Sequence, residues 1–494
     1  MRKPNLLFVM TDQQRWDAMS CASDWVRTPA IDRIAAEGVR FSECVTNSPL
    51  CVSARVSLAT GLYPHNTGVW QNVRYDIAAN TPTWMRAVRD AGYRTSLFGK
   101  THLHTHGDLR DGVPLLRSLG LDDIDEITDA RSIATRQCNL VSRWEEKGLL
   151  QSYRDEVHDR TQNDPYRAKA SVLPLEDYLD TYVGEQAANY LSAYDRDEPW
   201  FCWVSFGGPH EPWDAPEPYA SEYDPAAMPR ALRRAVSLPS RPRGQLDTWW
   251  NDVRSPTPAQ VAALRANYAG NVSLIDDQIA NILRVIEHRG ELDNTVIVFT
   301  SDHGEMNGDH GLVGKANLFE SSVKVPLLIR TAETAQSAIG GTVASTPVEL
   351  FDVGPTLVEL AGGSLVHEQF ARSLVPVLTD PRTPHRRFAV SEVLGEAMIR
   401  KDNWKVTVNS AGTPYLVFDL EADPGESLNL AGTPEVREVE AQMRNELLTH
   451  FLQAAPNLAP TSSPIYPAVS DLGTNVVTSS VRSNQTGDTV AIRH

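Results

Sequence analysis

The sequence predicts an α/β protein: a doubly wound, mostly parallel sheet with helices on both faces, and a small C-terminal α+β subdomain with an antiparallel sheet. Up to about residue 375, short apolar runs alternate with segments of helical periodicity, which is typical of a parallel sheet with crossover helices. Beyond Pro376, short strand-like runs follow one another directly, which is typical of antiparallel strands. We therefore expect a main domain over 1–375, a subdomain over 376–455 and an extended tail over 456–494.

Composition excludes several classes of protein. The chain has 494 residues, 41% of them hydrophobic and 22% charged, which allows a large buried core. A net charge of −17 without a basic stripe argues against a nucleic-acid partner. The five cysteines are scattered, so no disulfide framework or CxxC metal site is expected. The N-terminal apolar run is too short for a signal peptide and no run is long enough for a membrane span, which predicts a soluble, cytoplasmic protein.

The first strand and helix of the sheet are clear in the sequence. Residues 6–10 form a continuous apolar run that ends at Asp12 and Gln13, as expected of a central parallel strand with polar groups at its carboxyl end. A helix is expected after Thr28, with Pro29 in its first turn.

The next helix is expected over 81–91, with Thr81 as its N-cap. A strand over 95–98 follows and leads into Lys100 and His102. Residues 104–180 are polar and locally acidic, so we expect an insertion that covers the sheet without joining it.

The remaining elements continue the alternation. The strand over 200–206 precedes His210, and the strand over 295–300 precedes Asp302 and His303. Helices are expected over 185–194 and 262–288. In the subdomain we expect strands over 388–393, 397–400, 404–408 and 416–420, and a helix over 434–452. The Pro/Ser/Thr/Asn-rich tail is expected to be disordered or to lie across a partner subunit of a homo-oligomer.

Polar residues after four strands are expected at one edge of the sheet, because the carboxyl ends of parallel strands meet there. The carboxylates, amide oxygen and imidazole of Asp12, Gln13, Asp302 and His303 suit a divalent cation such as Ca²⁺, Mg²⁺ or Mn²⁺. Each residue alone has an ordinary structural explanation, but their joint placement favours a site. The same edge receives Lys100, His102 and His210, and a glycine-rich loop adds Lys315.

A further segment carries Cys51 and Arg55, four residues apart and therefore on one face of the helix that runs to Thr60 and Gly61. A helix N-terminus with a nearby cation suits an anionic ligand. The alternative is a buried cysteine beside an arginine in a structural ion pair.

Together these motifs resemble the formylglycine-dependent sulfatases of the alkaline phosphatase superfamily, over residues 1 to about 435. The family signature Cys-x-Pro-x-Arg followed by Thr-Gly corresponds to residues 51–55 with Thr60-Gly61. The other elements occur in the family's order: Asp12, Gly99-Lys100-x-His102, Pro209-His210-x-Pro212, Ser301-Asp302-His303-Gly304, Lys315, and a C-terminal hairpin over 418–426.

The resemblance implies a mechanism. Cys51 would be oxidised by a maturase to formylglycine, whose hydrate attacks the sulfur of a sulfate ester. Asp12, Gln13, Asp302, His303 and modified Cys51 would hold the metal, with Ca²⁺ expected and Mn²⁺ or Mg²⁺ as alternatives. Arg55 and Lys100 would fix the hydrate, and Lys315 and His210 would bind the sulfate and protonate the alcohol. His102 would deprotonate the second hydroxyl, which expels sulfate.

Three residues depart from the family pattern, and they bear on the branch of the family that this chain resembles and on the conversion of Cys51. Ser53 stands where the maturation signal usually has Pro, Gln13 replaces a second aspartate and His303 replaces a frequent Asn. Gln13 and His303 resemble the choline-sulfatase-like and phosphonate-monoesterase-like branches, as does a substrate-contacting Asn72.

We therefore expect hydrolysis of a small or aryl sulfate monoester. The alternatives are a phosphonate monoester or phosphodiester hydrolase and a non-catalytic anion binder with an unmodified cysteine. The insertion at 104–180, the stretch 213–223, and Trp249 and Trp250 are expected to line the alcohol side of the pocket.

Overall fold

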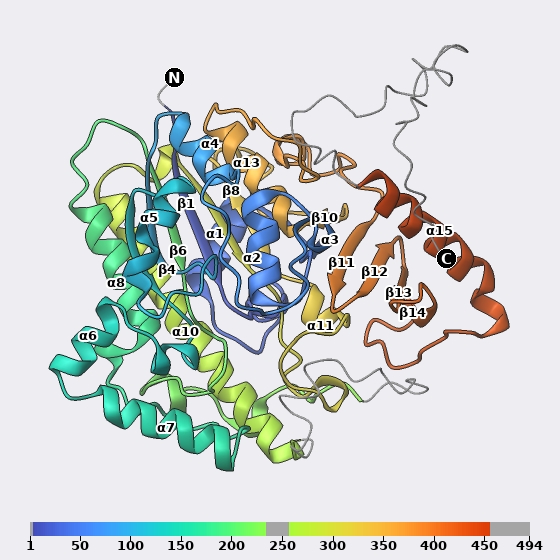
Figure 1. Ribbon diagram of the computed structural model, residues 1–494, viewed down its shortest axis with the longest axis horizontal. Helices are drawn as coiled ribbons and strands as arrows, with labels where there is room; N and C mark the ends of the chain where they lie inside the picture. The colour runs from blue at the N-terminus through green and yellow to red at the C-terminus, as the bar shows by residue number, and fades with distance from the viewer. Residues whose placement is uncertain (1–2, 234–255, 455–494) are drawn as a thin grey trace, which may run out of the picture. The chain divides into compact units, whose positions relative to one another are not determined.

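The computed structural model describes residues 3–233 and 256–454. Its main sheet has eight strands in the order β5-β4-β6-β1-β7-β8-β2-β9, and helices cover both of its faces (Figure 1). β8 runs antiparallel to its two neighbours, and the other pairings in this sheet are parallel. The strands are β1 (Asn5–Thr11), β2 (Val39–Phe41), β4 (Arg94–Lys100), β5 (Asp123–Ile127), β6 (Trp200–Ser205), β7 (Thr295–Ser301), β8 (Leu327–Arg330) and β9 (Thr342–Ala344).

β1 shows why the sheet is covered on both faces. Its seven residues are all buried, as its continuous apolar run requires. Leu7 and Val9 pack into one hydrophobic cluster, while Leu6, Phe8 and Met10 pack into another on the opposite face, because side chains alternate along a strand.

The helices divide between these two clusters. The Leu7 side carries α1 (Pro29–Glu37), α6 (Asn139–Glu146), α7 (Leu150–Asn163), α8 (Leu179–Ser192) and α10 (Pro258–His288). The Phe8 side carries α2 (Cys51–Thr60), α4 (Trp84–Asp90), α5 (Val113–Ser118), α13 (Val353–Leu360) and α14 (Val375–Thr379). Smaller elements are β3 (Cys44–Val45), β10 (Val348–Glu349), α3 (Pro64–Thr67), α11 (Glu320–Val323) and α12 (Ala332–Ala335).

The C-terminal part also agrees with the predicted fold class. An antiparallel sheet contains β11 (Ala389–Val393), β12 (Glu396–Lys401), β13 (Trp404–Val408) and β14 (Pro414–Asp419), and α15 (Arg437–Gln453) packs against it (Figure 1). The domain boundaries at 375 and 455 stay predictions. The tail, Trp249 and Trp250 lie outside the described residues.

Two expectations about local structure were wrong. α4 is capped by Thr83, not Thr81, because the Thr83 hydroxyl accepts a hydrogen bond from Arg86 N at 3.2 Å. The 104–180 segment does join the sheet: β5 is its edge strand, parallel to β4. Its acidic composition hid this strand, but Asp123 is paired with Arg94 and Asp125 accepts from Tyr182 at 2.6 Å.

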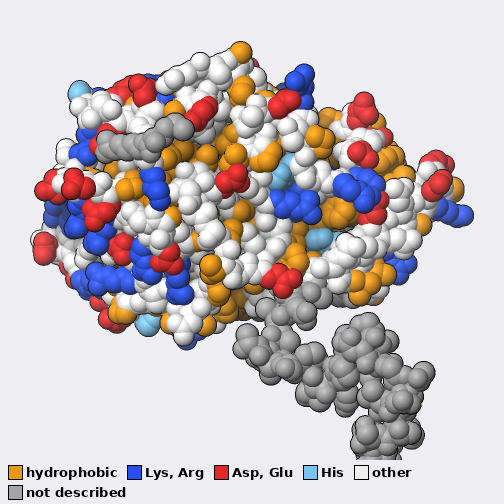
Figure 2. Space-filling model, turned by 90° about the horizontal axis from the view of Figure 1, so that it is seen from above, with side chains coloured by type: hydrophobic (Ala, Val, Ile, Leu, Met, Phe, Trp, Pro, Cys, Tyr) orange, Lys and Arg blue, Asp and Glu red, His pale blue; other side chains and the backbone are white. Residues whose placement is uncertain are grey.

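Charged side chains of both signs are interspersed over the face shown in Figure 2. Among the described residues, no helix is both long and apolar enough to cross a membrane.

Candidate active site

Two neighbouring strands bring the first carboxylates together. β1 and β7 pair in register, with Thr11 opposite Ser301, so the residues that follow them lie side by side. Asp12 and Asp302 are both fully buried, and Gln13 N donates to Asp302 Oδ1 at 3.0 Å. This is the edge where the sequence predicted a site.

Cys51 joins these carboxylates as the first residue of α2. Its Sγ lies 3.2 Å from His303 Nε2 and 3.8 Å from Asp12 Oδ1. One potential ligand atom from each of Asp12, Cys51, Asp302 and His303 falls within 4.8 Å of all the others, and all four residues are buried. Two carboxylates, an imidazole and a sulfur or oxygen at position 51 form a donor set that fits a divalent cation.

Arg55 ties the strand ends to α2. Its guanidinium lies 3.2 Å from Asp12 Oδ2 and 2.8 Å from Asp302 Oδ2, and it donates to Lys100 O at 2.7 Å and Ser205 Oγ at 3.0 Å. The buried ion pair considered for Arg55 therefore exists, and it is part of the predicted site. Its charge compensates two carboxylates that would otherwise be costly to bury.

Lys100 ends β4 and also contacts Asp12. Its ammonium pairs with that carboxylate and lies 3.2 Å from Asp129 Oδ2. The preceding Gly99 has φ +112°, and a Cβ there would lie 1.8 Å from Ser205 O, so only glycine lets β4 approach β6 this closely.

These charges set the protonation of the site. Burial opposes ionisation of Asp12, but the positive charges of Lys100, His210 and Arg55 outweigh it and hold the pKa of Asp12 well below its usual value. Burial also disfavours the charged form of Lys100, but Asp12 and Asp129 raise its pKa above the usual value. Both groups are therefore ionised near neutral pH.

His102 differs because no carboxylate holds it tightly. Its Nε2 lies 3.9 Å from Asp129 Oδ2, and its buried Nδ1 has no hydrogen-bond partner among the described residues. Burial and the charge of Lys100 hold the pKa of His102 well below its usual value. A neutral imidazole beside a nucleophile can accept a proton.

Gln13 and Lys315 form a second group beside the cluster. Lys315 donates to the Gln13 amide oxygen, and the Gln13 amide nitrogen donates to Glu211 Oε2 at 2.9 Å and to Glu305. The Gln13 oxygen therefore faces an ammonium group, and its role as a metal ligand stays a prediction. Burial disfavours the charge on Lys315, yet nearby Cys51 and Glu211 raise its pKa.

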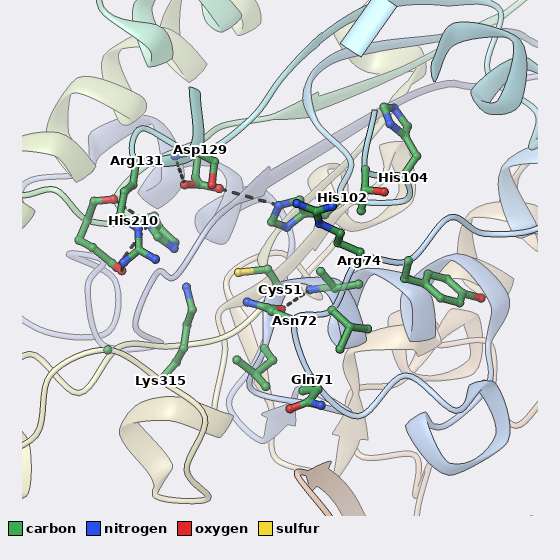
Figure 3. Close-up of a pocket in the computed structure, with 18 of the residues that line it drawn as sticks. Cys51, Gln71, Asn72, Arg74, His102, His104, Asp129, Arg131, His210 and Lys315 are labelled. Atoms are coloured by element: carbon green, nitrogen blue, oxygen red, sulfur yellow. Dashed lines mark hydrogen bonds and ion pairs between the residues drawn. The ribbon is translucent and has the colours of Figure 1, made fainter. Parts of the chain in front are cut away.

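His210 stands next to this group in the loop after β6. Its Nδ1 lies 2.8 Å from Glu211 O and 3.3 Å from Glu211 Oε2. Burial disfavours the imidazolium, but the Glu211 charge outweighs that effect and raises the pKa of His210. Lys315 and His210 thus provide two cations on one side of Cys51 (Figure 3).

A cavity of about 250 Å³ opens at Cys51. Asn72 contacts the first turn of α2 there, because its Oδ1 accepts from Val52 N at 3.0 Å, and its amide nitrogen has no partner among the described residues. Other lining residues are Gln71, Arg74, Tyr75, His102, His104, Thr105, Asp129, Arg131, Arg136, His210, Glu211 and Lys315.

The 104–180 segment lines this cavity, as expected. The expectation for 213–223 was wrong, because no residue of this stretch lines the cavity and Trp213 belongs to a separate hydrophobic cluster that includes Tyr268.

Sequence reasoning missed Asp129, Glu211 and Glu305. Asp129 follows β5 as Asp12 follows β1, so the strand-end rule would have found it had β5 been recognised. Glu211 directly follows His210, and Glu305 lies two residues after His303. The sequence did not show that both glutamates accept hydrogen bonds from Gln13.

Known proteins match this sequence and fold. The family described as Sulfatase matches residues 4–364, and the family N-sulphoglucosamine sulphohydrolase, C-terminal, matches residues 308–453. The multifunctional alkaline phosphatase superfamily protein PehA of Trinickia caryophylli is 29% identical, with 88% of this chain and 92% of that protein covered. The choline-sulfatase of Rhizobium meliloti is 30% identical, with 87% and 83% covered.

A solved structure agrees as well. The phosphonate monoester hydrolase of Agrobacterium radiobacter superposes with a TM-score of 0.76 at 26% identity, and the match covers 92% of this chain and 96% of that one. Three findings lead to the same family assignment. They are the buried Cys51 cluster at the edge of an α/β sheet, the family match over most of the chain, and the similarity to these relatives. The chain belongs to the sulfatase family of the alkaline phosphatase superfamily and is an enzyme of the sulfuric ester hydrolase type.

Proposed function

We propose that this enzyme hydrolyses sulfate monoesters of small or aryl alcohols, with the hydrate of a formylglycine derived from Cys51 as nucleophile. One observation carries the proposal: residue 51 lies between a buried cluster of metal-ligand type and the cavity where Lys315, His210 and His102 surround it.

Asp12, Asp302 and His303, with residue 51 and Gln13, would hold a divalent cation, for which Ca²⁺ is the proposed identity and Mn²⁺ or Mg²⁺ the alternatives. Such an ion supplies charge neutralisation for the sulfate and acidifies an oxygen of the hydrate. Arg55 pairs with Asp12 and Asp302, and Lys100 pairs with Asp12, so these two cations hold the carboxylates in place for the ion.

The first step transfers the sulfuryl group. One hydroxyl group of the hydrate loses its proton to solvent, its oxygen forms a bond to sulfur, and the bond from sulfur to the ester oxygen breaks in line with it. Lys315 and His210 bind the sulfate oxygens, and one of them gives a proton to the departing alcohol. The charge of Glu211 raises the pKa of both groups, which favours the protonated forms that this role needs.

The second step needs a base. Neutral His102 takes the proton of the remaining hydroxyl, the carbonyl of residue 51 re-forms, and the bond to the sulfate oxygen breaks to release sulfate. Water then hydrates the aldehyde. Asn72, with its amide nitrogen unengaged among the described residues, is proposed to contact the substrate.

Ser53 is compatible with this scheme in the folded protein. It lies in the first turn of α2, where the backbone N–H groups have no partner within the helix, so neither Ser nor Pro at this position removes a hydrogen bond of the helix. The proposed consequence of Ser53 lies in recognition by the formylglycine-generating maturase, which reads the chain before it folds.

A second candidate function is hydrolysis of phosphonate monoesters or phosphodiesters at the same site. The Agrobacterium phosphonate monoester hydrolase structure favours it, because a tetrahedral phosphoryl anion can use the same cationic groups. Rates on 4-nitrophenyl sulfate and on a phenyl phosphonate ester, each at saturating substrate, distinguish the two. Faster turnover of the phosphonate would reverse the ranking.

The decisive experiment is mass spectrometry of the peptide over residues 41–74, from protein produced with and without a maturase. We expect formylglycine at position 51 with the maturase present. Cysteine in every copy, together with no sulfate turnover, would favour the anion binder with an unmodified thiol. Cys51→Ser is expected to abolish turnover, whereas the control Cys21→Ser, outside the site, keeps it.

Removal of the metal provides an independent test. Dialysis against a chelator is expected to lower kcat by at least about 100-fold, and elemental analysis of the active protein identifies the ion. Restoration by Mn²⁺ but not by Ca²⁺ would correct the proposed metal.

A further inference from the structure

The alcohol side of the cavity has an unusual charge balance. The described residues that line the whole cavity include two carboxylates, Asp129 and Glu211, and four Arg or Lys side chains, Arg74, Arg131, Arg136 and Lys315. The chain as a whole carries a net charge of −17, so this wall has the opposite sign to the protein. Lys315 belongs to the sulfate side described above, which leaves three arginines to explain.

Both carboxylates of the cavity are already engaged. Asp129 Oδ2 lies 3.2 Å from Lys100 Nζ and also faces His102. Glu211 accepts from Gln13, pairs with His210 and lies 3.8 Å from Arg131. Asp129 and Glu211 are therefore not available to bind a cationic substrate. Glu211 also partly neutralises the charge of Arg131, so Arg131 is less suited than the other arginines to bind an anion.

Arg74 is the cation with no compensation. It is exposed and has no hydrogen-bond or ion-pair partner among the described residues. Its segment is anchored beside the nucleophile, because Asn72 contacts Val52, the residue next to Cys51. Figure 3 shows Arg74 and His102 on one side of Cys51, with Lys315, His210 and Arg131 on the other.

Arg136 lines the same cavity as Arg74, and backbone carbonyls fix its position. Its Nη1 donates to Thr105 O at 2.9 Å and to His106 O at 3.0 Å. These carbonyls fix the guanidinium without neutralising it, and Arg136 has no ion pair with a described carboxylate. Its other N–H groups have the fork geometry that binds a carboxylate or sulfate in two places.

From this charge distribution we infer that the alcohol part of the substrate carries a second oxyanionic group, a carboxylate or a second sulfate, which binds Arg74 and Arg136. The inference rests on the proposed function and narrows its substrate class. The reacting sulfate occupies the side of Lys315 and His210, and the second anion occupies the arginine side. An alcohol bearing a quaternary ammonium group is a poor substrate, because no unengaged carboxylate in the cavity receives it.

The test compares isosteric aryl sulfates. Values of kcat/KM are measured for 4-carboxyphenyl, 4-carbamoylphenyl and 4-nitrophenyl sulfate, and for 1,4-phenylene disulfate, with the wild type and Arg74→Gln. Arg74→Gln is expected to lower the ratio of carboxylate to carboxamide by at least about tenfold, the effect of one lost charge-assisted hydrogen bond. Because leaving-group reactivity is the same in both enzymes, it cancels from this comparison.

The controls keep the outcome unambiguous. Arg437→Gln, an exposed arginine on α15, should leave both the ratio and the kcat on 4-nitrophenyl sulfate unchanged. An unchanged ratio in both Arg74→Gln and Arg136→Gln overturns the inference, as does a wild-type preference for choline O-sulfate over both dianionic esters.

A binding measurement separates this inference from the proposed function. Calorimetry on the Cys51→Ala protein compares the affinities of the carboxylate and carboxamide esters, with and without Arg74→Gln. A tenfold fall in the affinity ratio supports the second-anion site even if no sulfate is turned over, which would count against the proposed reaction alone. No difference in affinity would overturn the second-anion site even in an active enzyme.

Discussion

Two parts of the site are organised in opposite ways: the buried residues around Asp12 and Asp302, which we call the inner cluster, and the cavity wall that carries Arg74 and Arg136, which we call the arginine wall. Around Asp12 and Asp302 every charge is fully buried and paired, with Arg55 and Lys100 between the carboxylates. On the wall, Arg74 is exposed and unpaired among the described residues, and Arg136 is held by backbone carbonyls alone. The inner cluster is fixed by the fold before any ligand arrives, whereas the wall keeps its binding capacity for the ligand. Four substitutions test this difference.

The largest effect is expected for Arg55→Met. It removes the guanidinium that pairs with both Asp12 and Asp302, so buried Asp302 loses its cation and Asp12 keeps only Lys100. Denaturant unfolding in the presence of a chelator should show a loss of about 3–5 kcal/mol in the free energy of unfolding. Arg55→Lys keeps the charge and should lose less. A loss below about 1 kcal/mol for Arg55→Met would show that the cluster does not depend on this residue.

Asp129→Asn should affect catalysis more than folding. Asp129 lies between Lys100 and His102, so its removal loosens the base of the second step. We expect kcat to fall by about 10–100-fold with KM changed less than threefold, as for other residues that orient a reacting group. Asp125→Asn, on β5 and outside the cavity, serves as control. Equal kcat values for the two variants would rule out a positioning role.

His104 gives the wall a pH dependence. Burial disfavours its charge, but the hydrogen bond to Glu126 at 2.6 Å outweighs this and raises the pKa of His104. Because the folded pKa lies above the unfolded value of 6.5, the associated stability is complete below pH 6.5 and is lost as pH rises through the folded value. The free energy of unfolding should therefore decline by about 1 kcal/mol or less between pH 6 and pH 9, and His104→Gln should make this decline smaller. Thermal unfolding of both proteins over this pH range measures it. Parallel curves for both proteins would contradict it.

The smallest effect on stability is expected for Arg74→Gln. With no described partner to lose, it should change the free energy of unfolding by less than about 0.5 kcal/mol. Its effect on dianionic substrates should nevertheless be large. A stability loss close to that of Arg55→Met would show that Arg74 serves the fold and not the ligand.

The same contrast explains what the sequence could predict. The strand-end rule places Asp12, Lys100, His210, Asp302 and His303 together, because the buried apolar runs before them are easy to recognise. It failed for Asp129, since β5 is an acidic edge strand whose carboxylates are paired by residues distant in sequence, such as Arg94. Arg74 and Arg136 lie in segments without regular structure, so only the folded chain shows that both line one cavity.

The helix caps show a similar limit. The composition around residue 82 marks a helix start, but two threonines compete for the cap and only the contact with Arg86 N selects Thr83. The orientation of Gln13 could not be predicted either, because it depends on Lys315, Glu211 and Glu305, which come from three other segments.

The antiparallel sheet also bears on how much of the chain an active enzyme needs. Glu392 on β11 donates its backbone N–H to Asn47 O at 2.9 Å, and its side chain accepts from His65 N at 2.9 Å. Asn47 and His65 flank α2, which begins with Cys51. The segments on either side of α2 are thus held by a strand that follows them by more than three hundred residues. We therefore expect the smallest active unit of this enzyme to include β11, because a protein shortened to the main sheet would lose these two contacts on either side of α2.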